Sequence, residues 1–328
     1  MKIAVVGAGV MGLAAARALA QRGEDVTVYE QFELGNQRGS SHGTSRIFRL
    51  SYAEESWIKL AQRAYELWRE LERETDTRLL VLDGLIDADP HPTKRLAAFD
   101  ACGVVYEMLS PADVRARFGY VYDDVERLIF TPDAGITLAD AAVAAFARSA
   151  RGAGAEIRER TRVEDLDSLP HDAVVVTAGG WAPKLLAAAG IELPAKPARE
   201  TVAYFALPEE GTFPSVIDWA SDGSFQLYAL RAPSVGVKAG LHHSGKPTDP
   251  ELEGEPDQAV VDAVSDLVRR RFPRVDPAPL RAETCIYTNT DDERFVCERH
   301  GRIVVGSACS GHGFKFAPAI GEQLAHLV

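Results

Sequence analysis

Residues 1–30 restrict the fold of this chain more than any other segment. Their pattern predicts a strand, a glycine-rich loop, a helix and a second strand, at residues 2–6, 7–12, 13–22 and 25–29. The first strand is apolar and β-branched, which is typical of a buried parallel sheet, and the helix is rich in alanine. This order predicts a βαβ unit, and therefore a parallel sheet that is covered by helices.

The glycines of this loop have the spacing that dinucleotide-binding proteins use. Gly7 permits a tight turn, Gly9 lets the backbone approach a pyrophosphate, and Gly12 lets the helix pack closely on the strand. The free N–H groups at the start of the helix attract phosphates. Glu30, at the end of the second strand, can accept hydrogen bonds from ribose hydroxyl groups. The segment predicts dinucleotide binding, and it does not distinguish FAD from NAD.

The composition is that of an acidic globular protein. The 328 residues carry a net charge of −12, and a chain of this length is expected to form two domains. The negative charge argues against nucleic acid or an anionic membrane as a partner, and no apolar run reaches ~20 residues. The N-terminal apolar run is too short for a signal peptide, so we expect a cytoplasmic protein. The four cysteines lack metal-ligand spacing, and no metal site is expected.

The remaining segments predict an α/β nucleotide-binding domain of discontinuous segments, into which a mostly antiparallel domain is inserted twice. Helices are expected at 57–75, 138–151, 259–270 and 318–327, with a short capped helix after Ser110. Strands are expected at 79–87, 156–162, 201–206, 215–219, 225–230, 235–239 and 302–306, and residues 173–181 are expected to form a buried strand that runs into a glycine turn. We assign residues 1–80, 138–198 and 290–328 to the nucleotide-binding domain and residues 81–137 and 199–289 to the substrate domain.

Several basic residues lie in loops and turns rich in glycine and serine instead of on charged helical faces. They are His42, Arg46, Arg49, Lys238, His242, His312 and Lys315. Glycine and serine neighbours indicate close packing or close approach of a ligand, so converging loops would form a cationic pocket for a small anion. Arginine binds a carboxylate through two parallel hydrogen bonds, and lysine adds a point charge. For each residue taken singly, a surface charge or a structural ion pair is the alternative.

Nearly the whole chain resembles the monomeric sarcosine oxidase and N-methyltryptophan oxidase group of the glycine/D-amino-acid oxidase superfamily. Besides the N-terminal glycines, the resemblance rests on four segments, at residues 39–49, 236–242, 285–295 and 310–315. The last two are the most specific, because dinucleotide binding by itself does not require them. The resemblance implies a Rossmann-type FAD-binding domain and an antiparallel substrate domain, in a glutathione-reductase-2-like or D-amino-acid-oxidase-like fold.

The resemblance also implies roles for individual residues. Cys285 matches the position that carries FAD covalently, through an 8α-S-cysteinyl link; a buried core thiol is the alternative reading. The other residues implied in cofactor binding are Gly7, Gly9, Gly12, Glu30, Ser41, His42, Gly179, Gly311, His312, Gly313 and Lys315. Arg49 and Lys315 match the pair that holds the substrate carboxylate, and Tyr228 is placed beside the substrate. The catalytic group would be Lys238, His242, Arg46 and Tyr287, with Lys238 activating dioxygen.

The expected substrates are a small amine that carries a carboxylate, such as an N-methyl or cyclic amino acid, and O2. The amine must bind neutral, because an ammonium has no lone pair, and a cationic pocket lowers the pKa of a bound ammonium. A hydride then passes from the carbon next to nitrogen to the flavin, which leaves an imine, and O2 becomes H2O2. One alternative is a biosynthetic flavin oxidase that desaturates a cyclic imino acid or a peptide-derived amine. An NAD-dependent dehydrogenase that uses only the N-terminal glycines is another.

Two positions depart from the pattern of these relatives. Arg231 follows Tyr228 where they have Tyr-Gly-x-Pro, and we expect it to point outward; pairing with a second acidic group of the substrate is the alternative. Ala308-Cys309 replaces a Gly-Phe pair and is expected to reshape the wall of the cavity. The protein is expected to be a monomer, and the substrate side chain stays open.

Overall fold

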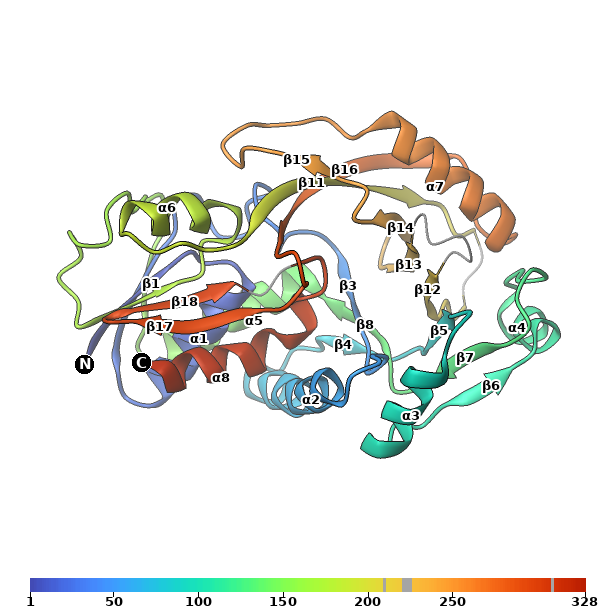
Figure 1. Ribbon diagram of the computed structural model, residues 1–328, viewed down its shortest axis with the longest axis horizontal. Helices are drawn as coiled ribbons and strands as arrows, with labels where there is room; N and C mark the ends of the chain where they lie inside the picture. Colours follow the sequence, from blue (N-terminus) through green and yellow to red (C-terminus); the bar gives the residue numbers. More distant parts are fainter. Residues whose placement is uncertain (209–210, 220–225, 308–309) are drawn as a thin grey trace.

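The structure is a computed structural model that describes residues 1–208, 211–219, 226–307 and 310–328 (Figure 1). The described strands form three sheets, of six, nine and three strands. Within the described residues, no helix is both long and apolar enough to cross a membrane.

The six-stranded sheet is the nucleotide-binding sheet that residues 1–30 predict. Its strands, in spatial order, are β17 (Val296–His300), β18 (Ile303–Ser307), β10 (Ala173–Val176), β1 (Lys2–Val6), β2 (Asp25–Tyr29) and β9 (Glu156–Arg158). All neighbouring pairs are parallel except β17 with β18. Ile3 to Val6 are all buried, because helices cover both faces of the sheet.

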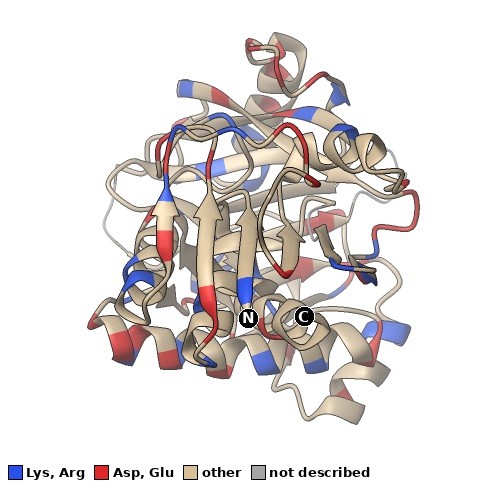
Figure 2. Ribbon diagram, turned by 90° about the vertical axis from the view of Figure 1, so that its left-hand side faces the viewer, with Lys and Arg blue, Asp and Glu red and all other residues tan. Residues whose placement is uncertain are grey.

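The two faces of this sheet pack against different helices. Ile3 and Val5 belong to a core shared with α1 (Val10–Gln21), α2 (Glu55–Thr75), α5 (Ala139–Gly152) and α8 (Ala317–Leu327). Ala4 and Val6 pack on the other side against α6 (Ala182–Ala188), which follows the short turn η1 (Gly179–Trp181). Figure 2 shows the central strands of this sheet largely free of charged residues, whereas charges lie on its edge strands and on the surrounding helices and loops.

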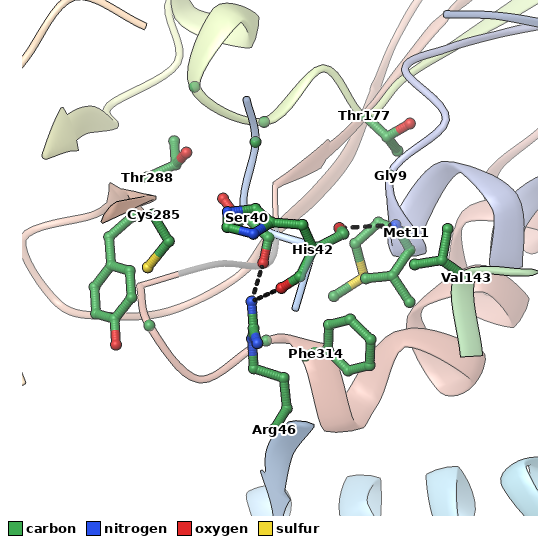
Figure 3. A pocket seen from close by; sticks show the side chains of 18 of the residues that line it. Gly9, Met11, Ser40, His42, Arg46, Val143, Thr177, Cys285, Thr288 and Phe314 are labelled. Atoms are coloured by element: carbon green, nitrogen blue, oxygen red, sulfur yellow. Dashed lines mark hydrogen bonds between the residues drawn. The ribbon is translucent and has the colours of Figure 1, made fainter. Parts of the chain in front are cut away.

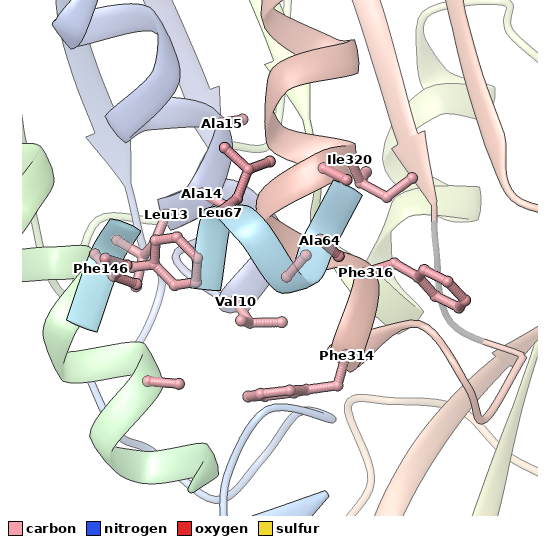
Figure 4. Close-up of a cluster of buried hydrophobic side chains, with 14 of the residues drawn as sticks. Val10, Leu13, Ala14, Ala15, Ala64, Leu67, Phe146, Phe314, Phe316 and Ile320 are labelled. Carbon is pink, nitrogen blue, oxygen red and sulfur yellow. The ribbon is translucent and has the colours of Figure 1, made fainter. Parts of the chain in front are cut away.

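The core beneath α1 joins the two ends of the chain. Side chains of α1, α2, α5 and α8 meet in one apolar cluster with the turn η2 (Phe314–Phe316) (Figure 4). Gly321 lets α8 lie directly on α1, since a Cβ there would lie 2.6 Å from the carbonyl carbon of Ala14. Trp68 and Phe146 are fully buried in this cluster, and each contributes about 1.5–3 kcal/mol by its burial.

The nine-stranded sheet is mostly antiparallel, as predicted, and only β5 and β12 pair in parallel. Its strands are β15 (Lys246–Pro247), β11 (Lys196–Phe205), β14 (Gly236–His242), β13 (Gln226–Ala232), β12 (Ser215–Trp219), β5 (Leu85–Ala88), β7 (Leu128–Thr131) and β6 (Glu107–Leu109), with β16 (Pro279–Asn289) paired to β11. One face packs on α7 (Gln258–Arg271), through residues such as Phe205, Ala229 and Ala239. The opposite face is free to line a cavity.

The third sheet and two further helices connect these layers. The sheet consists of β3 (Ser45–Phe48), β8 (Gly135–Leu138) and β4 (Leu80–Val81), and the helices are α3 (Thr93–Cys102) and α4 (Pro111–Phe118). Ser110 caps α4, as predicted, through a reciprocal capping box with Asp113. The strands of the six-stranded sheet all lie within residues 1–80, 138–198 and 290–328, although the domain boundaries themselves stay a prediction.

Several strand predictions are wrong in extent. The strand expected at 201–206 is β11, which begins at Lys196, and the one expected at 235–239 is β14, which continues to His242. Residues 79–87 form two strands in different sheets, β4 and β5, because Gly84 turns the chain between them with a φ of +95°. The strand expected at 156–162 ends at Arg158, and Arg160 has a left-handed backbone with a φ of +52°. Phe225, where the strand at 225–230 was expected to begin, lies outside the described residues.

Candidate active site

A cavity of about 1270 Å³ extends from the glycine loop of β1 and α1 to the free face of the nine-stranded sheet. Its wall includes residues from the loop after β10 and from η1, from the segment at 35–46, and from β12, β13, β14, β16 and η2. This volume exceeds what one small ligand needs, so it is suited to a large cofactor together with a small substrate.

The glycine loop has no room for side chains. A Cβ on Gly12 would lie 1.9 Å from the carbonyl oxygen of Gly7, and one on Gly7 would lie 2.7 Å from that of Thr177. Gly7 also has a φ of +101°, a conformation that only glycine adopts readily. The structure therefore confirms that Gly7 permits a tight turn and that Gly12 lets the helix pack closely on the strand.

Polar groups gather at the start of α1 and at the end of β2. The hydroxyl of Ser41 accepts a hydrogen bond from the backbone N–H of Val10 at 3.0 Å, and a Cβ on Gly9 would lie 3.2 Å from that hydroxyl. The carboxylate of Glu30 is buried and accepts from the backbone N–H groups of Ala8 and Phe32, at 2.8 and 2.9 Å. Each carboxylate oxygen can still accept a further hydrogen bond.

Figure 3 shows the loop at 39–46 beside the strand β16, with His42 and Cys285 both among the residues that line the cavity. The hydroxyl of Ser40 donates to the carbonyl oxygen of Ile286, which ties this loop to β16. Arg46 donates to the carbonyl oxygens of Ser40 and His42, at 2.9 and 2.7 Å, and so holds this loop in place. Burial, with the charges of Arg46 and Lys238, lowers the pKa of His42 to about 4. Its buried Nε2 has no hydrogen-bond partner within the described part of the chain.

The cavity face of the nine-stranded sheet presents its side chains in rows, because paired residues on neighbouring strands point to the same face. One row is Trp219, Gln226 and His242; the next is Ile217, Tyr228, Gly240, Val202 and Glu283; the third is Leu230, Lys238, Tyr204 and Arg281. Gly240 makes room for Tyr228, since a Cβ there would lie 2.6 Å from the tyrosine hydroxyl.

Lys238 lies in the third row and is 6% exposed. Burial, followed by the charge of Arg46, lowers the pKa of its ammonium to about 7. Among the residues that the structure describes, Lys238 has no hydrogen-bond or ion-pair partner, and its ammonium lies 5.9 Å from the ring centroid of Tyr204. An amine of this kind is available to a ligand in the cavity.

Arg49, Lys315 and Tyr52 form a cationic group at another part of the wall. The ammonium of Lys315 donates to the Tyr52 hydroxyl at 3.0 Å and to the carbonyl oxygen of His312 at 2.6 Å. The guanidinium of Arg49 stacks on the Tyr52 ring, 4.1 Å from its centroid. Burial, and then the charge of Arg49, hold the pKa of Lys315 well below its usual value. Neither cation has an acidic partner in the described residues, so the pair is suited to bind an added carboxylate.

The segment from Ser310 to Lys315 is fixed by close contacts. Gly311 has a φ of +73°, and a Cβ there would lie 2.1 Å from the Tyr287 ring and 2.6 Å from the His242 ring. The Nε2 of His312 pairs with the carbonyl oxygen of Glu293 at 3.0 Å. Gly313 precedes η2, and the indole of Trp68 donates to the carbonyl oxygen of Lys315 at 2.7 Å.

The histidines do not contribute the positive charge that the sequence suggested. Burial is the largest cause in each case: it lowers the pKa of His242 to about 3, with help from His243, and that of His312 to about 3, with help from Lys315. With His42, all three are neutral at pH 7. The prediction that they add charge to the pocket is therefore wrong. Arg46 and Arg49 supply its permanent positive charge, since burial lowers the pKa of both Lys238 and Lys315.

The structure bears on some of the other sequence-based expectations for this site. Gly179, with a φ of +52°, lines the cavity at η1. Arg231 points outward as expected: it donates to the carbonyl oxygen of Gly211 at 2.7 Å and does not line the cavity. Ala308-Cys309, expected to reshape the wall, lies outside the described residues. The expectation of no metal stays a prediction, since ligand atoms of His242, His243 and Glu293 lie within 4.8 Å of one another.

Sequence reasoning missed several residues of the wall that carry polar or aromatic side chains. Among them are Tyr52, Arg95 and Trp219, which come from segments without the glycines that drew attention elsewhere. Tyr52 could have been found from its position three residues after Arg49, next to the predicted carboxylate site. Arg95 and Trp219 are placed there only by the packing of α3 and β12, and no local signal marks them.

A dinucleotide loop that opens into a cavity large enough for a cofactor and a substrate is typical of a dinucleotide-dependent redox enzyme. The family model described as FAD dependent oxidoreductase (DAO) matches residues 2–327, and the chain belongs to this family. Peroxisomal sarcosine oxidase from Homo sapiens is 31% identical to the chain, over 98% of this chain and 90% of its own length. Monomeric sarcosine oxidase from Bacillus sp. (strain B-0618) is 28% identical, over 99% of this chain and 91% of its own length.

A solved structure agrees with these matches. NikD, described as an unusual amino acid oxidase essential for nikkomycin biosynthesis, superposes with a TM-score of 0.87 and 28% identity, over 99% of this chain and 93% of its own. The resemblance and the fold class predicted from sequence are confirmed, and the protein is an FAD-dependent amine or amino-acid oxidase. The family leaves the nicotinamide alternative without support.

Proposed function

We propose that the enzyme oxidises a secondary amine that carries a carboxylate, such as an N-methyl or cyclic amino acid. The observation that carries the proposal is the pair of Arg49 and Lys315, buried without an acidic partner among the described residues, in the same cavity as the dinucleotide loop. The two sarcosine oxidases support it, because sarcosine has both an N-methyl amine and a carboxylate.

The residues of the cavity fit FAD. Gly9 and the start of α1 leave a cradle that a side chain would fill, Glu30 offers acceptors to a ribose, and the buried Nε2 of His42 is without a protein partner in the described chain. We propose that Cys285 holds the flavin covalently, since it lines the same cavity from β16. When bound, FAD would accept a hydride from the carbon next to nitrogen and pass its electrons to O2, giving H2O2.

The protein's own side chains would prepare the substrate. Arg49 and Lys315 hold the carboxylate, and their charges lower the pKa of the neighbouring ammonium, so that the amine binds with its lone pair free. His242 and Tyr287 lie beside one another, with ring centroids 5.7 Å apart, and form the wall at Gly311. Because His242 is neutral at pH 7, its ring can accept a hydrogen bond from the substrate.

Lys238 would serve the second half of the reaction. Reduction of O2 places negative charge on oxygen, and a fixed cation in a water-poor cavity stabilises that charge. With a pKa of about 7, Lys238 can also give up a proton near neutral pH. Arg46 would act by holding the loop that contains Ser41 and His42 against the cofactor.

A peroxide-release screen tests the proposal. N-methyl and cyclic amino acids should release H2O2 with the flavin-loaded enzyme, and their decarboxylated analogues should react far more slowly. Equal rates with the decarboxylated amines would remove the carboxylate role of Arg49 and Lys315. Absence of oxidation with every secondary amine would remove the proposal itself.

A biosynthetic oxidase is the second candidate, and the likeness to NikD favours it. If the enzyme is a biosynthetic oxidase, cyclic imino acids should release H2O2 faster than N-methyl amino acids in the same screen. Their unsaturated products should absorb light and can be identified by mass spectrometry.

We further propose that the enzyme is a cytoplasmic monomer, as the name of the Bacillus relative suggests for its state of assembly. Sedimentation of the purified protein and fractionation of cells test these two points.

A further inference from the structure

A second group of hydrogen-bond donors lies in the cavity wall, beside the carboxylate clamp of Arg49 and Lys315. Arg95 from α3 and Trp219 from β12 both line the cavity, and the guanidinium of Arg95 lies over the Trp219 ring, 5.0 Å from its centroid. Arg95 is 6% exposed. Arginine is rarely buried unless it is paired, so Arg95 is not an ordinary surface charge, and its contacts in the cavity wall require an explanation.

The protein fixes Arg95 along one edge and leaves the other edge open. Its Nε donates to Asp89 at 2.9 Å, and its Nη1 donates to the carbonyl oxygen and the hydroxyl of Ser51, at 3.0 and 3.1 Å. Its Nη2 has no protein acceptor among the described residues. The guanidinium is therefore held rigidly, with one nitrogen ready for an acceptor in the cavity.

Ser51 joins this arginine to the clamp. Its carbonyl oxygen also accepts from Nη1 of Arg49, so that two guanidinium groups share one acceptor. The Ser51 hydroxyl donates to Asp87 at 2.5 Å, which fixes the serine from beneath. A ligand whose carboxylate is held by Arg49 and Lys315 has Arg95 as its next neighbour along the wall.

Trp219 lies in the sheet row that leads to the reacting end of the cavity. It is paired with Gln226, which is paired with His242, so that two strand spacings, or about 10 Å, separate Trp219 from His242. The indole Nε1 of Trp219 is buried without an acceptor in the described part of the chain. Two donors, from Arg95 and Trp219, are thus unpaired at the same end of the cavity.

We propose that the substrate of this oxidase has, besides its amine and its carboxylate, an acceptor oxygen on its side chain, which Arg95 Nη2 binds with Trp219 Nε1 as a second donor. This inference rests on the proposed function. The acceptor is a second carboxylate or an amide carbonyl, because both offer oxygen lone pairs to N–H groups. A substrate that ends in a methyl group leaves both donors unpaired, and a site built around hydrogen bonds rejects such analogues strongly.

Binding of three inert acids of equal length tests the proposal without turnover. Isothermal titration calorimetry of the flavin-loaded enzyme compares glutarate, glutaramate and pentanoate, which end in a carboxylate, an amide and a methyl group. We expect glutarate or glutaramate to bind roughly tenfold or more tightly than pentanoate, as one hydrogen bond to a charged donor allows. Whichever of the two binds more tightly identifies the acceptor.

Variants separate recognition from a structural role. In Arg95→Met, the affinity difference between the acceptor-bearing acids and pentanoate should fall to within about twofold. Arg294→Met is the matched control, since Arg294 lines the cavity, is largely exposed and pairs with Glu54; it should keep the difference. Trp219→Phe retains the ring and loses only the N–H, so it should reduce the difference even if Arg95→Met folds poorly.

Two results would overturn the proposal. Pentanoate could bind the wild-type enzyme as tightly as both other acids, or Arg95→Met and Trp219→Phe could weaken all three acids equally, as loss of structure would. The titrations need no oxidation. A failure of the proposed amine oxidation would appear in the peroxide screen, and a failure of acceptor recognition in these affinities.

Discussion

Replacing Lys315 by methionine removes the ammonium from the carboxylate clamp and keeps a similar apolar stem. Two of the three N–H groups of Lys315 go to Tyr52 and to the carbonyl oxygen of His312, which leaves one for a ligand. A hydrogen bond to a charged group contributes about 1.5–3 kcal/mol. Because about 1.4 kcal/mol equals a factor of ten, Lys315→Met should bind pentanoate roughly 10- to 100-fold more weakly.

The same variant should reduce the proton uptake that accompanies binding of pentanoate. Burial and Arg49 hold the pKa of Lys315 well below its usual value, and a bound carboxylate opposes both causes by favouring the charged form. At about pH 9, below the ordinary pKa of lysine, wild-type enzyme should therefore take up protons as pentanoate binds. Calorimetry in two buffers with different heats of ionisation measures this uptake, and Lys315→Met should show less of it.

The pH dependence of the protein's stability tests independently whether the pKa of Lys315 is lowered. A lysine with a lowered pKa in the folded state binds fewer protons than in the unfolded chain, so wild-type stability rises with pH between the two pKa values. Lys315→Met should lose that rise, whereas Lys59→Met, at an exposed lysine paired with Glu55, should keep it. Unchanged pentanoate affinity together with unchanged proton uptake would refute the assignment of Lys315 to the clamp.

Three further substitutions test the rest of the site. Cys285→Ser should release the flavin into the supernatant on acid precipitation, whereas wild-type protein keeps it in the pellet; flavin free in both would end the covalent proposal. Lys238→Met should still be bleached by an amine substrate without O2, while its reoxidation by O2 slows by about 100-fold, and equal losses in both half-reactions would contradict the role. Gly311→Ala places a side chain against Tyr287 and His242 at a φ of +73°. It should lower the free energy of unfolding in urea by at least about 1–2 kcal/mol. If the variant were as stable as the wild type, the loop would have to shift without cost.

Much of the fold followed from local patterns because the six-stranded sheet is buried on both faces. Its strands are therefore continuous apolar runs: the buried strand expected from Ala173 begins at that residue, and the helix expected at 318–327 begins one residue earlier and ends at Leu327. Strand β16 was not predicted from the sequence pattern. Its residues before Ile286 are half-buried or exposed and mostly polar on the cavity face, so the alternation that marks a strand is weak.

The site was predictable where backbone geometry demands glycine or where a motif lies in one segment. Gly12 and Gly311 are examples, since a Cβ at either position would overlap a neighbour. The charge states were not predictable. The low pKa of His242 depends on burial by residues from β16 and from the loop after β18, and such burial has no sequence signal. The same holds for Arg95, which reaches the cavity only through the packing of α3.

The packing of α8 on α1 has a consequence for the order of events in the cell. Gly321 lies against Ala14, and the loop from Ser310 to Lys315 closes the cavity that Gly7 to Gly12 begin. A nascent chain on the ribosome has the N-terminal half of this enclosure long before it has the C-terminal half. Flavin can therefore be enclosed only after residues 310–321 have been synthesised and docked, and covalent attachment would follow the completion of the fold.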